Sequence, residues 1–133
     1  MKINVDGQFK KFWLAYGNGW HPFYGHEIKV GEYSFVVGGQ GGGLLISELS
    51  TGAKVKHMPM NPLLLLTTST REDTLEFYRK NVGVMLSELV QIDVFKQEIE
   101  RMGKKIKEEY PPQPPIEIAD DSIIREPISN LLN

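Results

Sequence analysis

Apolar and polar residues along the first 60 positions alternate with the period of two that is typical of strands. The alternation is clearest over residues 11–16, where Phe12, Leu14 and Tyr16 lie on one predicted face. Pro22 cannot donate to a ladder, so residues 20–24 are predicted as an edge segment or a loop. Further strands are predicted at residues 26–30, 33–37, 44–49 and 53–57. The pattern indicates an antiparallel meander of four to five strands.

Glycines separate these predicted strands. The sequence Gly17-Asn18-Gly19 predicts a two-residue turn, because Asn-Gly favours positive φ. The run from Gly38 to Gly43 holds five glycines around Gln40 and lies between two apolar strands. We expect it to form a wide, mobile hairpin tip. The residues of this tip expected to contact a partner are Gly39, Gln40 and Gly41.

From Thr70 the apolar period becomes that of a helix. Ser69 and Thr70 each precede an acidic residue by three positions, which predicts a capping box at the helix start. Apolar residues then recur in steps of three and four, at Leu75, Tyr78, Val82, Met85, Leu89, Ile92, Phe95, Ile99, Met102 and Ile106. This stripe, residues 75–106, is predicted to cover the sheet. Its near-heptad spacing also permits a homo-oligomer formed through the same stripe.

The helical pattern slips once, at residues 91–93. One straight helix through both halves would be on the order of 55 Å long at 1.5 Å per residue, longer than a domain of this size. We therefore expect one kinked helix or two helices, with Asp93 as an N-cap.

Prolines divide the remainder of the chain. Residues 58–69 contain two prolines and four leucines and are predicted as a packed linker rather than a strand. The sequence PPQPP at residues 111–115 predicts a stiff extended spacer. The prediction is one α+β domain over residues 1–110, its N-terminal sheet packed against the C-terminal helix, and a Pro-rich spacer with a flexible or docking tail over residues 111–133. The tail residues expected to bind a partner are Pro112, Pro114, Ile123 and Ile124.

Composition restricts the classes of function. The chain has 133 residues, 41% of them hydrophobic, which suffices for a single core. A net charge of −2 removes the general electrostatic basis for binding nucleic acid. There is no cysteine, which fits a reducing compartment, and no apolar run approaches the roughly 18 residues that span a bilayer. We expect a cytoplasmic protein without a membrane segment.

No sequence motif predicts catalysis or a cofactor. The glycine run lacks the lysine of a phosphate-binding loop and precedes a predicted strand instead of a helix. His21, His26 and His57 lack the spacing of metal ligands, and Ser47 lacks the elbow motif of a serine hydrolase. The prediction is therefore a protein that is not an enzyme and holds no metal or cofactor.

Aromatic residues gather near the N-terminus, where nine of the 13 lie in the first 37 positions. Most are expected to fill the core between sheet and helix. The alternative is a weak single-stranded nucleic-acid platform, in which rings stack on bases beside lysines. Its residues are Lys10, Lys11, Trp13, Trp20 and Lys29, and the net charge disfavours it.

Residues 33–105 combine a strand, the turn sequence SELSTG, a second strand and a Thr-capped amphipathic helix. This order resembles small uncharacterised proteins carried by phages and prophages of Gram-positive bacteria. The resemblance implies a short accessory protein that acts by binding, and it assigns no functional residue. It does not extend to the insertion at residues 58–66 or to the proline-rich tail. The leading hypothesis is a non-enzymatic module that binds a protein partner.

Overall fold

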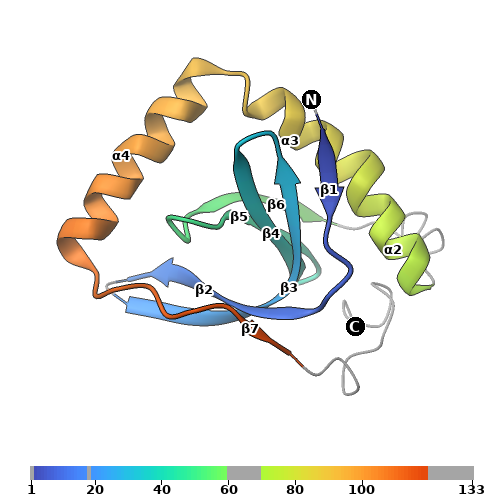
Figure 1. Cartoon of the computed structure of the whole chain (residues 1–133), viewed down its shortest axis with the longest axis horizontal. Helices are drawn as coiled ribbons and strands as arrows, with labels where there is room; N and C mark the ends of the chain where they lie inside the picture. The colour runs from blue at the N-terminus through green and yellow to red at the C-terminus, as the bar shows by residue number, and fades with distance from the viewer. Residues whose placement is uncertain (1, 18, 60–69, 120–133) are drawn as a thin grey trace.

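A computed structural model describes residues 2–17, 19–59 and 70–119 of the chain. It confirms the predicted α+β class, with an antiparallel sheet first and helices after it (Figure 1). The strands are β1 (Ile3–Val5), β2 (Lys10–Tyr16), β3 (Gly19–Val30), β4 (Tyr33–Gln40), β5 (Gly43–Glu48), β6 (Lys54–Pro59) and β7 (Glu117–Ile118). They form one sheet in the order β6-β5-β4-β3-β2-β7, and β1 pairs with β3. The sheet is larger than predicted because β1 and β7 are too short to show a recognisable alternation.

The strand β3 is one bent strand of 12 residues, where the sequence predicted two separate segments. Its first half pairs with β2, and its second half pairs with β1 and β4. Among the described residues, no strand pairs with the other edge of the first half, which explains why Pro22 is tolerated there. The bend lies at Gly25, where an added Cβ would lie 2.2 Å from the carbonyl oxygen of Val37. Figure 1 shows β3 turning from a horizontal first half to an upright second half.

The glycine run forms a tight hairpin, so the predicted wide tip is wrong. Gln40, the last residue of β4, pairs with Gly43, the first residue of β5. Only Gly41 and Gly42 remain in the turn, with φ of 54° and 76°, the positive values that a two-residue hairpin needs. Side-chain alternation could not reveal this, because a glycine at a ladder position has no side chain to mark its face.

Both faces of the sheet carry a buried core. The larger core joins strands β3, β4 and β5 to the first helical segment, through residues that include Ile28, Phe35, Val37, Leu44, Ile46, Phe77, Tyr78, Val82 and Leu86. The smaller core lies inside the bend of the sheet and consists of Phe12, Phe23, Val36 and Leu45. The expectation that the N-terminal aromatics fill a core is thus correct for Phe12, Phe23 and Phe35, whereas Tyr16 and Tyr24 are exposed.

The bend brings the two ends of the sheet together. The Ala15 amide on β2 donates to the carbonyl of Gly52, which follows β5, at 2.9 Å. An added Cβ at Gly52 would lie 2.7 Å from the Ala15 nitrogen and from the Trp20 ring, so the approach requires glycine. Strand β2 therefore covers the smaller core, and the sheet resembles a partly closed barrel.

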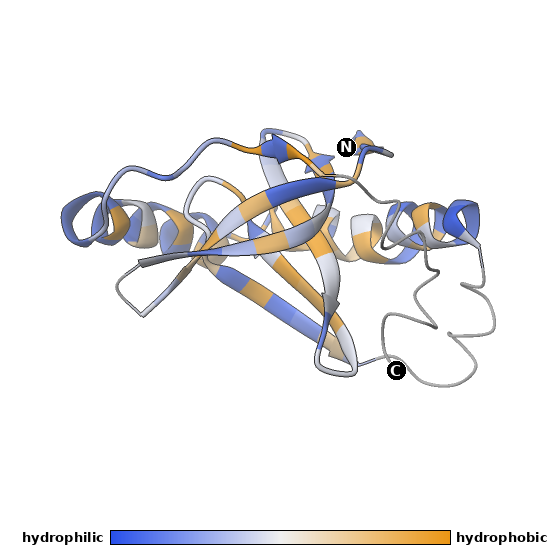
Figure 2. Ribbon diagram, turned by 90° about the horizontal axis from the view of Figure 1, so that it is seen from below, coloured by the Kyte–Doolittle hydropathy of each residue, from blue (hydrophilic) through white to orange (hydrophobic). Residues whose placement is uncertain are grey.

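Two helical segments flank the sheet. The first joins α2 (Arg71–Phe77), a π-helical turn (Tyr78–Val82) and α3 (Gly83–Leu89), and the second is α4 (Asp93–Glu109). The two segments form an inverted V over the sheet (Figure 1). Figure 2 shows apolar residues on the central strands and alternating apolar and polar bands along both segments. Among the described residues, no helix combines the length and apolar content needed to cross a membrane.

The helix boundaries test the predicted caps. The Thr70 hydroxyl accepts a hydrogen bond from the Asp73 amide at 3.0 Å, which confirms the cap at Thr70. The predicted break at residues 91–93 is also confirmed. Asp93, however, is the first residue of α4, and the cap position is Ile92, which makes no side-chain capping bond.

Residues 110–119 lie along the sheet. The Trp20 indole donates to the Pro111 carbonyl at 2.8 Å, and the Gln113 amide donates to the carbonyls of Trp13 and Leu49 at 3.0 and 3.1 Å. The strand β7 then pairs with β2. The predicted spacer is thus attached to the sheet as far as residue 119. The linker residues 60–69 and the tail residues 120–133 lie outside the described residues, and a domain boundary at residue 110 stays a prediction.

Candidate functional site

The helix α4 is attached to the sheet near its two ends. At the N-terminal end, the Phe95 ring lies 5.4 Å from the Tyr33 ring and 6.1 Å from the Phe35 ring. At the C-terminal end, Ile106 is buried, and the Tyr110 ring just beyond the helix lies 5.3 Å from the Trp20 ring. Ile106 is the one buried residue of α4, although the apolar stripe predicts several. The middle of α4 therefore packs less closely on the sheet, and its Ile99, Met102 and Gly103 are only partly buried.

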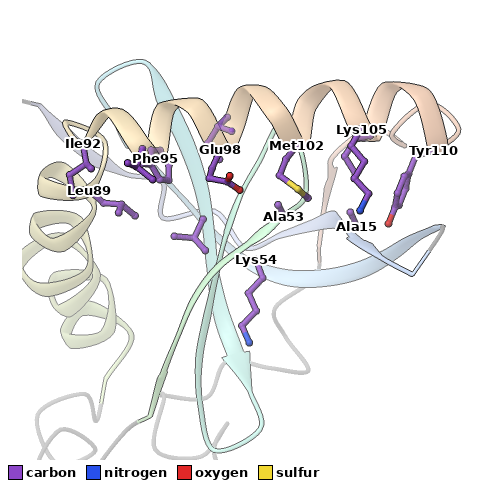
Figure 3. A pocket seen from close by; sticks show the side chains of 14 residues that line it. Ala15, Ala53, Lys54, Leu89, Ile92, Phe95, Glu98, Met102, Lys105 and Tyr110 are labelled. Carbon is purple, nitrogen blue, oxygen red and sulfur yellow. The ribbon is translucent and has the colours of Figure 1, made fainter.

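A groove of about 500 Å³ lies between α4 and the sheet. The helix side of the groove carries Ile99 and Met102, which are partly buried, and the sheet side carries Ala15, Ala53 and Val55. Figure 3 shows these side chains from close by, with Met102 directed from α4 toward Ala53. The alanines are too small to reach the helix, and this is the physical cause of the groove. Pockets of this volume and apolar character are the size that binding sites need.

Two charged side chains of α4, Glu98 and Lys105, extend toward the groove (Figure 3). The Arg101 guanidinium binds the Glu98 carboxylate at 2.9 Å. The hydrogen bond from Arg101, and then its positive charge, lower the pKa of Glu98, so this carboxylate is ionised at neutral pH. Lys105 makes no ion pair within the described ranges. The groove thus has one negative group, Glu98, with Lys105 two helical turns further along α4 and Lys54 on the sheet side.

Two exposed apolar side chains extend the groove at the start of α4. Ile92 is 50% exposed and Val94 is 65% exposed. Both residues line the groove. Ile92 ends the turn in which its amide donates to the Leu89 carbonyl at 3.1 Å, and Val94 lies two residues later. Apolar surface is therefore exposed beside the groove at the start of α4.

The groove was not predicted as a site from the sequence. The apolar stripe was recognised, but it was expected to cover the sheet along its whole length. No local pattern shows that Ala15 and Ala53, which are 38 residues apart, face the middle of the same helix. Their small size is informative only once the fold has placed them there.

The predicted partner-binding residues lie in separate places. Gly39 and Gln40 are exposed at the end of β4, and Gly41 is in the following turn. Pro112 is exposed, and Pro114 lines a cavity with Leu49 and Ser50, at the opposite end of β5 from the glycine turn. The structure does not bring the glycines and prolines together. Ile123 and Ile124 lie outside the described residues.

Four of the five residues predicted to bind nucleic acid contact other parts of this chain, and Lys29 lies apart from them. Lys10 pairs with Asp6 at 2.8 Å, and the Lys11 ammonium lies 3.7 Å from the Glu117 carboxylate and 4.7 Å from the centre of the Trp13 ring. Trp13 and Trp20 are each partly buried beside residues 110–113, and Lys29 is exposed near the other end of β3. Stacking on these indoles would compete with residues 110–113, so the alternative stays a prediction without added support.

In comparisons with known proteins, no family model, no curated protein and no solved structure matches the chain. The resemblance to phage-type accessory proteins accordingly stays a prediction. The geometry of the groove is therefore the basis for a proposal of function.

Proposed function

We propose that this protein is a non-enzymatic interaction module, and that the groove beneath α4 is its docking surface. The observation that carries the proposal is that α4 packs closely on the sheet near its ends, which leaves a mostly apolar groove beside its partly buried middle. We further propose that the groove of one copy receives α4 of a second copy, so that the protein acts as a self-associating module.

The charge pattern of α4 supports a second copy as the occupant. Glu98 and Lys105 are seven residues apart, about 10.5 Å along the axis at 1.5 Å per residue. When two copies of α4 lie antiparallel, Glu98 of each copy faces Lys105 of the other, and two ion pairs form. When they lie parallel in register, Glu98 faces Glu98 and the charges repel. The pattern therefore favours an antiparallel pair related by twofold symmetry.

The apolar pattern supports the same arrangement. The apolar stripe of α4 recurs at alternating steps of three and four, the spacing of helices that pack on helices. Phe95 and Ile106 of this stripe contact the sheet of their own copy, so Ile92, Ile99 and Met102 are the side chains left for a second helix. In the monomer this stripe is incompletely covered, and Ile92 is half exposed. A second helix beside the groove removes apolar surface from water at about 25 cal/mol per Å².

The sequence predicted a homo-oligomer formed through the stripe at residues 75–106. The present proposal places the contact between copies in the second half of that stripe alone. Tyr78, Val82 and Leu86 are buried in the larger core, and Val84 is the exposed large apolar side chain of this first helical segment. The proposal assigns self-association to α4.

We also propose that the protein has an accessory role in the cytoplasm, as its predicted resemblance to small phage-type proteins implies. The absence of cysteine supports a reducing compartment. The groove also supports binding in preference to catalysis, because its lining is mostly apolar and its tyrosine hydroxyl, on Tyr110, already donates to the Gly17 carbonyl.

Charge reversal combined with sedimentation equilibrium tests the proposal. We expect the natural chain to form a dimer. Glu98→Lys and Lys105→Glu each place like charges opposite one another and weaken dimerisation by about tenfold. The double variant Glu98→Lys/Lys105→Glu restores both ion pairs and therefore the dimer.

The matched control is Glu100→Lys, which makes the same charge change at an exposed position of α4 outside the groove. It should leave the dissociation constant unchanged. A natural chain that stays monomeric at high protein concentration, or a double variant no better than the single ones, would show that α4 does not pair in this way.

A further inference from the structure

A second cavity lies at the mouth of the partly closed barrel, next to the helix groove, and the linings of both include Ala15 and Lys54. It has a volume of about 460 Å³ and is lined by side chains from five strands, among them Leu14 of β2, Phe23 of β3, Gln40 of β4, Leu45 of β5 and Lys54 of β6. The smaller core forms one side of it, since Phe23 and Leu45 belong to that core. Mouths of small β-barrels are common places for small-molecule sites.

An unpaired hydroxyl is buried in the lining of this cavity. Ser47 is 0% exposed, and its Oγ has no hydrogen-bond partner among the described residues. Ser47 lies at an irregularity of the β5–β6 pairing, a feature that often redirects a side chain near a binding site. A buried hydroxyl without a partner is costly. A ligand that offers it a hydrogen bond removes this cost.

The polar groups on the rim are neutral or positive. Lys54 makes no ion pair within the described ranges, and Figure 3 shows its side chain directed away from α4. No Asp or Glu lines the cavity. Tyr16 and His21, both exposed, form an edge-to-face pair with ring centres 5.3 Å apart. An apolar floor, an aromatic rim and a free ammonium group together match a flat apolar body that carries one negative charge.

We propose that the barrel mouth binds a small aromatic carboxylate. The ring lies on Phe23 and Leu45 beside the Tyr16–His21 pair, the carboxylate faces Lys54, and one ligand oxygen reaches the Ser47 hydroxyl after a small movement of the strand. Gln40, which the sequence predicted to contact a partner, is on the same rim.

Amide chemical-shift titration with benzoate, and with benzamide as its uncharged counterpart, tests this proposal on the full chain. Benzoate should cause saturable shifts at Leu14, His21, Leu45 and Ser47, and benzamide should bind more weakly at the same place. Lys54→Gln should weaken benzoate binding by about fivefold and leave benzamide binding unchanged. Ser47→Ala should weaken the binding of both.

Lys56→Gln is the matched control, because Lys56 is an exposed lysine of the same strand that does not line the cavity. It should bind benzoate like the natural chain. The proposal fails if benzoate produces no saturable shift, if the shifts fall on Ile99 and Met102 in the helix groove, or if Lys54→Gln and Lys56→Gln behave alike.

Discussion

The side chain of Glu48 closes the turn between β5 and β6. It is 3% exposed, and its carboxylate accepts hydrogen bonds from the amides of Ser50 and Thr51, each at 2.9 Å. The Ser50 hydroxyl donates to the same carboxylate at 2.8 Å. A carboxylate on the last residue of a buried strand thus supplies acceptors to amides that would otherwise lack partners.

Replacing Glu48 tests this role. Glu48→Ala leaves the Ser50 and Thr51 amides without their acceptor and should lower the free energy of unfolding by about 2–3 kcal/mol. Glu48→Gln keeps one acceptor oxygen and should cost about half as much. Urea unfolding measures both values. Glu32→Ala, at an exposed turn position, is the control, and equal losses at positions 32 and 48 would contradict the role of Glu48.

Other single residues show where local sequence is sufficient. Thr70 was predicted as a cap from the acidic residues that follow it, and its hydroxyl does accept the Asp73 amide. The prediction failed for Asp93, although Asp is an equally good capping residue, because the chain becomes helical one residue earlier. A hydrogen bond between residues three apart can be predicted from a sequence. The first residue of a helix, in contrast, depends on how the neighbouring elements pack.

At the scale of elements, residues 110–119 act as a strap across the sheet. Gln113 connects β2 and the end of β5 by donating to the carbonyls of Trp13 and Leu49. Pro111 accepts from the Trp20 indole, so both tryptophans lie beside this segment. The proline-rich composition predicted an extended segment correctly, but it could not indicate that the segment returns to the sheet.

Removing the Gln113 amide tests the strap. Gln113→Ala should lower the free energy of unfolding by about 1–2 kcal/mol, because two hydrogen bonds are lost. It should also shift tryptophan emission to longer wavelength, since water then reaches Trp13 and Trp20. Pro112→Ala changes an exposed side chain in the same segment and should leave the emission unchanged. Emission that is identical in the natural chain and in Gln113→Ala would show that the strap does not depend on this residue.

At the scale of the whole molecule, two glycines permit the bend of the sheet. Gly25 on β3 and Gly38 on β4 lie against each other's strands: an added Cβ at Gly25 would lie 2.2 Å from the Val37 oxygen, and one at Gly38 would lie 2.3 Å from the Tyr24 oxygen. Backbone atoms cannot move aside as a flexible side chain can. The smaller core and the barrel mouth both depend on this close approach.

Adding one methyl group at the bend tests that dependence. Gly25→Ala should lower the free energy of unfolding by about 3 kcal/mol, because the clash is with backbone. Gly19→Ala is the matched control on the same strand, where nothing lies within 4 Å of an added Cβ. It should change stability by less than about 1 kcal/mol. Calorimetric unfolding that gives equal shifts for the two variants would contradict the role of Gly25 in the bend.

The sequence by itself determined the order and type of most elements. Alternation predicted the strands of the meander, the change of period predicted helices after Thr70, and the slip at residues 91–93 predicted their separation. These features depend on contacts between residues close along the chain, where side-chain direction follows the local backbone.

Only the tertiary structure decided which surfaces remain open. The groove depends on Ala15 and Ala53 facing α4, the barrel mouth depends on the Ala15–Gly52 contact, and the strap depends on Gln113 reaching Leu49. Each joins residues far apart in the chain, and closing such contacts is governed by the volumes of side chains from several elements at once. A hydrophobic pattern indicates which face of an element is apolar, but the shapes of the assembled elements decide whether another element buries that face.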